Sequence, residues 1–193
     1  MSTIKEKSIH LWTVQRHEAW KVFQRLGVLR GDGRRVDRSF LPAYHWMMEQ
    51  MKKRLPAYKG RFPVWSWYQP KPDLRCKGFL PAGSRGVRIE FAKPREQVLL
   101  SDFGSWHCIL DNHYLPLTEA EQQEWEMRLR ERGRNGAVVP PDLQEMITRS
   151  WERIFDLEAI NASEMMGPVT EIQAVVEEIL LDEVIRVTEF IAR

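Results

Sequence analysis

The chain of 193 residues has few of the features that mark secreted, membrane-spanning or zinc-binding proteins. Its two cysteines, Cys76 and Cys108, are too few for a disulfide framework and form no CxxC pair of the kind found in structural zinc sites. No run of about 18 apolar residues indicates a transmembrane helix, and the polar start MSTIKEKSIH lacks the apolar centre of a signal peptide. We therefore expect a cytoplasmic protein that does not associate with a membrane.

Glycine motifs that bind phosphate are also missing. RGDGRR (30–35) and AGSRG (82–86) do not have the spacing of a P-loop or of a dinucleotide-binding turn. The residues His107, Cys108 and His113 are chemically suited to bind metal, but their spacing matches no common zinc site and a helix would point them in different directions. We expect no metal here, and we expect Cys108 to be a small core residue.

What the chain does have is an uneven distribution of charge, although its formal net charge is only +2. Residues 1–62 carry +9, residues 63–116 carry +2 and residues 117–193 carry −9. A basic segment attracts nucleic acid, so residues 16–62 are one candidate surface, and the acidic C-terminal third is a candidate contact for a protein partner. The alternative is that the basic and acidic segments face each other in the fold or are simply solvated.

Hydrophobic periodicity predicts an α+β fold made of one domain over residues 1–193. Strands are predicted at 9–15, 63–69 and 87–91, a central strand at 98–102, and two final strands at 172–179 and 184–191, joined by LLDE. Helices are predicted over 16–26, 39–55, from 103 onward, over 118–132 and over 140–159. This order does not alternate as in a doubly wound sheet, so we expect a mostly antiparallel sheet with surrounding helices.

Capping residues support these helices. Expected caps are Ser39, Asp102, the box of Thr118 with Glu121, and the box of Asp142 with Glu145. The first helix should bury Ala19, Val22, Phe23 and Leu26 and end at Gly27.

Polar and aromatic residues at strand ends and on helix 39–55 predict a small-molecule cleft. The candidates are Thr13, Gln15, Tyr44, Trp65, Trp67, Arg75, Arg88, Glu171 and Gln173. The acidic residues Glu177, Glu178, Asp182 and Glu183 are more simply explained as a solvated cluster.

The blocks KPDLR (71–75) and VLLSDF..WH (98–107) resemble a bacterial and phage family known only as a domain of unknown function. A more distant resemblance joins LWTVQRHEAWKVFQRLGVL (11–29) and EIQAVVEEILLDEVIRV (171–187) to the first and last strands of ADP-ribosyltransferase-like domains. That resemblance implies a split sheet, with NAD as the substrate.

The resemblance also implies roles for single residues. Thr13 stands where those domains carry a His or similar polar residue, and Gln15 shares its strand face. Glu171 or Gln173 stands near their catalytic Glu; if Gln173 is the match, that position has no carboxylate to hold the ribose.

NAD binding would further involve an aromatic wall of Tyr44, Trp65 and Trp67, with Arg75 or Arg88 at the pyrophosphate. Three functions follow as hypotheses. They are an ADP-ribosyltransferase acting on nucleic acid or protein, a non-catalytic nucleotide or nucleic-acid binding module of the same fold, and an interaction protein of a toxin or phage-defence system.

Overall fold

The computed structural model describes residues 8–69, 73, 75, 79–131 and 139–193. The chain divides into two compact units, which we call the sheet unit (Met1–Leu100 with Gln173–Arg193) and the helical unit (Ser101–Ile172). Each unit is described by itself, and the expectation of a single domain stays a prediction.

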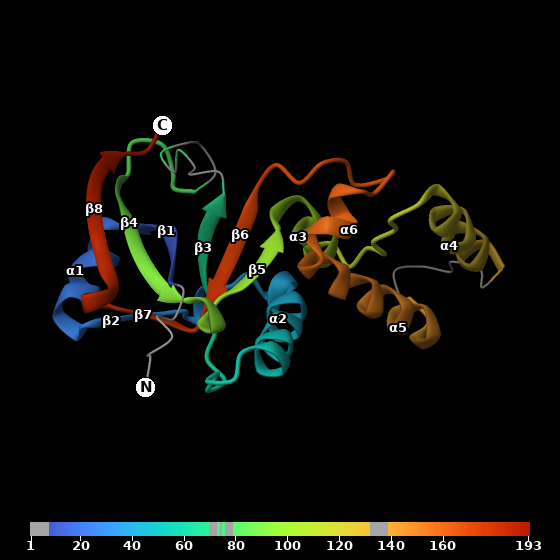
Figure 1. Cartoon of the computed structure of the whole chain (residues 1–193), viewed down its shortest axis with the longest axis horizontal. Coiled ribbons are helices and arrows are strands. Elements are labelled where there is room, and N and C mark those ends of the chain that lie inside the picture. The colour runs from blue at the N-terminus through green and yellow to red at the C-terminus, as the bar shows by residue number, and fades with distance from the viewer. Residues whose placement is uncertain (1–7, 70–72, 74, 76–78, 132–138) are drawn as a thin grey trace, which may run out of the picture. The chain divides into compact units, whose positions relative to one another are not determined.

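A six-stranded, mostly antiparallel sheet has the strand order β5-β6-β3-β1-β4-β8 (Figure 1). Its strands are β1 (Ser8–Arg16), β3 (Val64–Gln69), β4 (Arg85–Pro94), β5 (Leu99–Asp102), β6 (Ile172–Val176) and β8 (Val184–Ile191). A separate two-stranded sheet pairs β2 (Val28–Arg30) with β7 (Glu178–Leu180). The predicted α+β architecture with a mostly antiparallel sheet is therefore confirmed.

Six α-helices lie within the described residues. They are α1 (His17–Leu26), α2 (Leu41–Arg54), α3 (Phe103–Leu110), α4 (Glu119–Glu131), α5 (Pro141–Ser150) and α6 (Leu157–Asn161). Short 3-10 helices occupy Gly33–Arg35, Arg38–Phe40, Arg95–Gln97, Trp151–Phe155 and Leu181–Glu183. None of the helices in the described part of the chain combines the length and the apolar character that crossing a bilayer requires.

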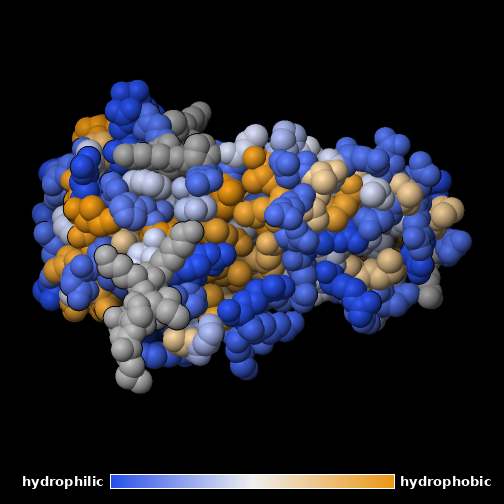
Figure 2. All heavy atoms as spheres, in the orientation of Figure 1, coloured by the Kyte–Doolittle hydropathy of each residue, from blue (hydrophilic) through white to orange (hydrophobic). Residues whose placement is uncertain are grey.

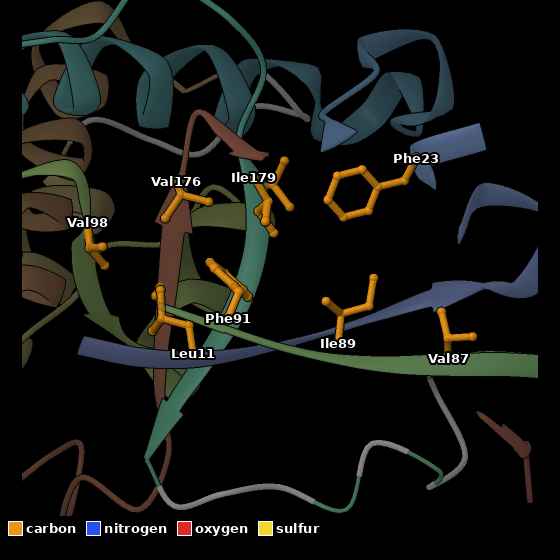
Figure 3. Close-up of a cluster of buried hydrophobic side chains, with 10 residues drawn as sticks. Leu11, Phe23, Val87, Ile89, Phe91, Val98, Val176 and Ile179 are labelled. Atoms are coloured by element: carbon orange, nitrogen blue, oxygen red, sulfur yellow. The ribbon is translucent and has the colours of Figure 1, made fainter. Parts of the chain in front are cut away.

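The core of the sheet unit lies on one face of β1 and β4. Leu11 is directly opposite Phe91 and Thr13 is opposite Ile89, so these four side chains share a face. Figure 3 shows Leu11, Ile89 and Phe91 projecting to the same side of β1 and β4, where Phe23, Val176 and Ile179 complete the cluster. All of these apolar residues are almost fully buried, and burial of such a side chain contributes roughly 1.5–3 kcal/mol to stability.

The first helix is correctly predicted in position but not in orientation. Gly27 ends α1 with a φ of +72°, and its amide donates to the carbonyl of Phe23, as the sequence indicated. Phe23 is buried, but Val22 is 41% and Leu26 is 61% exposed, so the expected four-residue stripe is wrong. The helix instead packs through Trp20 and Phe23, whose rings meet edge to face at 5.5 Å.

Two strand predictions are wrong. The place of a strand in the sheet and the point where it ends depend here on pairing between segments that are far apart in the sequence. The apolar run at 98–102 forms β5, which lies at an edge of the sheet rather than at its centre. The segment 172–179 is not one strand: it divides at Glu177 into β6 of the large sheet and β7 of the small one. β8 pairs with β4, so the last strands are not neighbours.

Helix caps were predicted with mixed success. Asp102 caps α3 by accepting the amide of Ser105 at 2.6 Å, and the Thr118 hydroxyl accepts the amide of Glu121 at 3.2 Å, as expected. Ser39 caps no α-helix, because it lies inside the 3-10 helix that precedes α2 and binds Asp37.

The second predicted box, of Asp142 with Glu145, is misplaced, because Asp142 lies in the first turn of α5 rather than before it. This helix starts after Pro140 without any side-chain cap. The single helix expected over 140–159 is also interrupted, because Asp156 starts α6 by accepting the amide of Ala159 at 3.0 Å.

Candidate functional site

Thr13 and Gln15, the candidates on the first strand, hold each other in place. The Thr13 hydroxyl donates to the carbonyl oxygen of Trp65 at 2.9 Å and accepts from the Gln15 amide at 3.1 Å. Thr13 is only 2% exposed. Its hydroxyl therefore joins β1 to β3 and has its donor hydrogen already in use.

The aromatic candidates lie on the opposite face of the sheet from Thr13. Trp12 is directly opposite Trp67, and side chains alternate along a strand, so Trp67 and its second neighbour Trp65 project away from the Thr13 side. Tyr44 of α2 meets the Trp65 ring edge to face at 5.8 Å. Burial raises the pKa of Tyr44.

The two candidate arginines occupy different surroundings. Arg88 is opposite Val14 on β1, and so on the face that holds Trp12. The Arg75 guanidinium binds the carboxylate of Asp73 at 2.6 Å, and this bond holds the pKa of Asp73 well below its usual range. Arg75 is thus already bound to an anion, whereas Arg88 forms no ion pair with any residue that the structure describes.

The two candidates for the catalytic position, Glu171 and Gln173, belong to different units. Gln173 belongs to β6 of the sheet unit and is 4% exposed. Glu171 belongs to the helical unit, where its backbone carbonyl accepts the amide of Phe103 at 3.0 Å.

The uneven charge of the sequence becomes a difference between the units. The sheet unit has 23 Lys and Arg against 13 Asp and Glu, which is +10, whereas the helical unit is −8. Part of the basic excess is neutralised by C-terminal acids: Glu178 binds Arg30 at 2.8 Å and Arg61 at 2.9 Å, and Glu189 binds Arg85 at 3.0 Å. Basic and acidic segments thus do face each other at these positions.

The helical unit pairs its own charges and aromatic rings. Arg153 binds the Glu121 carboxylate at 2.7 Å and the Leu115 carbonyl at 2.6 Å, and lies 5.7 Å from the centre of the Tyr114 ring. Tyr114 in turn stacks on Trp125 at 4.8 Å. These contacts stabilise the unit from within.

Sequence reasoning missed a cavity of about 260 Å³ in the sheet unit. Three segments line it, from residues 55–59, 93–97 and 177–183. Lys93 is 4% exposed and its ammonium lies 2.6 Å from the carboxylate of Glu183, which also accepts the amide of Leu180 at 2.7 Å. A signal was present: Lys93 continues the alternation of Val87, Ile89 and Phe91, which predicts that its side chain faces the core.

Glu177 is the single residue between β6 and β7, and it also lines this cavity. One of its carboxylate oxygens accepts the amides of Lys59 at 2.8 Å and Arg61 at 3.1 Å. The acidic cluster of the C-terminal segment is therefore not simply solvated, because Glu177, Glu178 and Glu183 each bind groups far away in the sequence.

The reactive side chains of α3 form no centre within the described residues. Burial, together with the charges of Asp111 and Asp102, raises the pKa of the Cys108 thiol, which disfavours the nucleophilic thiolate. Nowhere in the described ranges do three His, Cys, Asp or Glu side chains come close enough together to hold a metal ion. Cys76 lies outside the described residues.

Comparison with known proteins places this chain in a family. No curated protein and no solved structure matches it. Residues 10–185 match the family model described as "Domain of unknown function (DUF3841)". Since this match spans far more than half of the chain, the protein belongs to the DUF3841 family.

Proposed function

We propose that the sheet unit binds nucleic acid or a nucleotide, on an ADP-ribosyltransferase-like fold and without transferring ADP-ribose. The observation that carries this proposal is the net charge of +10 on the sheet unit, against −8 on the helical unit. Phosphate groups bind where basic side chains gather, and such binding releases counterions.

Segment 16–62 carries basic side chains that are exposed. Arg16, Lys21, Arg25, Arg38 and Lys52 are exposed, and no carboxylate of the described residues forms an ion pair with them. Hydrophilic residues cover the part of the surface over α2 at the lower centre of Figure 2. These cations are available to phosphate groups without first breaking an internal salt bridge.

The former catalytic candidates favour binding over transfer. Thr13 is buried with its hydroxyl engaged. If Gln173 rather than Glu171 is the residue that matches the catalytic Glu, an amide stands where transfer requires a carboxylate to stabilise developing positive charge. The fold assignment itself rests on resemblance: a polar residue on the first strand, a helix ending at Gly27, and strands divided between two sheets. The acidic helical unit, in contrast, is suited to a basic protein partner, which stays a prediction.

Fluorescence anisotropy with labelled 20-nucleotide RNA and DNA tests this proposal. We expect binding that weakens steeply as the salt concentration rises, because each phosphate contact releases a counterion. Arg25→Glu should weaken binding at least fivefold. Arg149→Glu is the matched control, because Arg149 is also exposed and lies in the last turn of a ten-residue helix, but in the acidic unit.

Three outcomes would overturn the proposal. Equal weakening by both variants, or a salt-independent affinity, would exclude a phosphate-binding surface on the sheet unit. Incubation with labelled NAD gives the third outcome, because release of nicotinamide together with label on protein or nucleic acid would make the protein a transferase.

A further inference from the structure

The cavity of the sheet unit has a built-in imbalance between its carboxylates. Glu178 has two guanidinium partners, Arg30 and Arg61, and Glu183 has the buried ammonium of Lys93. Glu177 has only backbone amides as partners, and no cationic side chain of the described residues forms an ion pair with it. The negative charge of Glu177 therefore faces the cavity without a salt bridge of its own, although the exposed side chain of Lys59 also lines this cavity.

The surroundings of Tyr58 reflect this charge. Tyr58 lines the same cavity, and its hydroxyl donates to the carbonyl of Arg61 at 2.8 Å. Burial, together with the negative charges of Glu177 and Glu49, raises the pKa of Tyr58 to about 12. A cation placed beside Tyr58 would thus meet both a negative potential and the face of an aromatic ring.

The rest of the lining suits a short hydrocarbon chain. Leu55, Ala57 and Leu180 provide apolar surface, and Glu96, which is exposed and forms no ion pair within the described residues, supplies a second carboxylate. A water molecule takes up about 30 Å³ in the liquid, so the cavity has room for roughly eight or nine atoms of that size. A whole dinucleotide is several times larger, which separates this cavity from the surface proposed above.

We propose that this cavity binds a small aliphatic ammonium ion, with the ammonium group against the Glu177 carboxylate and the Tyr58 ring, and the carbon chain against Leu55 and Leu180. Glu177 is preorganised for this role, because two backbone amides from one loop hold its carboxylate in position. The buried pair of Lys93 and Glu183 is already neutral and forms a wall of the cavity.

Calorimetric titration of the whole chain with 1,4-diaminobutane at pH 7 and low salt tests this site. We expect a dissociation constant below about 1 mM, which is within the range open to a ligand of this size. 1-Butanol, which has a similar chain without the charge, should not bind. Absence of diamine binding, or equal binding of 1-butanol, would overturn the proposal.

Glu177→Gln should weaken diamine binding at least tenfold. Glutamine keeps an oxygen that accepts the amides of Lys59 and Arg61, so the loop retains its hydrogen bonds. Asp182→Asn removes the same charge from an exposed residue that does not line the cavity, and it should change the affinity less than twofold. If both variants changed the affinity equally, general electrostatic attraction would explain the binding, and the proposed site would be refuted.

A measurement on the unmodified protein keeps the test decisive if Glu177→Gln does not fold. In NMR spectra, diamine should shift the Tyr58 ring and Lys59 amide signals, while the Arg25 amide on the proposed nucleic-acid surface stays unchanged. Shifts confined to residues outside the cavity would contradict the proposal. Arg25→Glu, which should weaken nucleic-acid binding, should leave the diamine-induced NMR shifts unchanged. Either proposal can therefore be refuted without the other.

Discussion

Lys93→Met gives the sharpest test of how the sheet unit holds its buried charges. Lys93 is 4% and the Glu183 side chain 18% exposed, and their charged atoms are 2.6 Å apart. Methionine has nearly the same length as lysine without its charge, so the change removes the ion pair and leaves little empty space. The Glu183 carboxylate then keeps only its bond from the Leu180 amide.

The expected loss follows from the burial of the remaining charge. Removing one partner of a buried pair costs about 3–5 kcal/mol, because the other charge stays desolvated. Water reaches part of Glu183, so we expect about 3 kcal/mol, the lower end of this range. For a chain of this length, that loss corresponds to a fall in Tm of roughly 6–12 °C.

The double variant Lys93→Met with Glu183→Gln distinguishes a lost pair from lost packing. The glutamine oxygen still accepts the Leu180 amide, and no charge is left buried. Its free energy of unfolding should therefore be within about 1 kcal/mol of the wild-type value. Urea denaturation at pH 7 measures all three proteins. The reasoning is refuted if Lys93→Met costs less than about 1 kcal/mol, or if the double variant is as unstable as the single one.

Three further predictions concern a cap, a titrating acid and a glycine. Asp102→Ala should cost about 1–2 kcal/mol by removing the cap on the Ser105 amide, and Asp102→Asn should cost less because it keeps an acceptor; equal losses in urea denaturation would contradict this. Burial of Glu178 opposes its ionisation, but the hydrogen bond and charge of Arg30 and the charge of Arg61 outweigh this and lower its pKa below 4.5. The ionised Glu178 carboxylate therefore stabilises the fold above pH 4.5, and this contribution is lost as the pH falls below that value. Glu178→Gln should flatten the acid part of the curve of unfolding free energy against pH. An unchanged slope would contradict this prediction. Gly31→Ala would place Cβ 2.5 Å from the carbonyl oxygens of Phe62 and Pro63, and should lower stability by about 1–3 kcal/mol, whereas an unchanged Tm would show that the loop yields freely.

The elements predicted well are those that depend on residues close together in the sequence. The end of α1 at Gly27 needs only a left-handed residue after a helical stripe, and the Asp102 cap needs only an acceptor three residues before an amide. The strand β1 is found from alternation within a single segment. Such signals act within about four residues, and the sequence contains them completely.

The candidate site was harder to predict, because it depends on which face each strand presents. The predicted cleft included both Thr13 and Trp67 among its candidates, yet the register that pairs Trp12 with Trp67 sends them to opposite faces. A shift of one residue in that register would have reversed the arrangement. The cavity escaped notice for the same reason, since it joins residues 55–59, 93–97 and 177–183.

The sequence by itself determined the fold class, the position of most helices and strands, and the excess of positive charge near one end and of negative charge near the other. The tertiary structure alone decided that β5 is an edge strand, that Glu177 divides the last apolar segment, and that Lys93 is buried beside Glu183. Local patterns follow from the geometry of a few neighbouring residues. Strand order and buried ion pairs depend instead on contacts between segments that lie as much as 90 or 118 residues apart, as for Lys93 with Glu183 and Lys59 with Glu177.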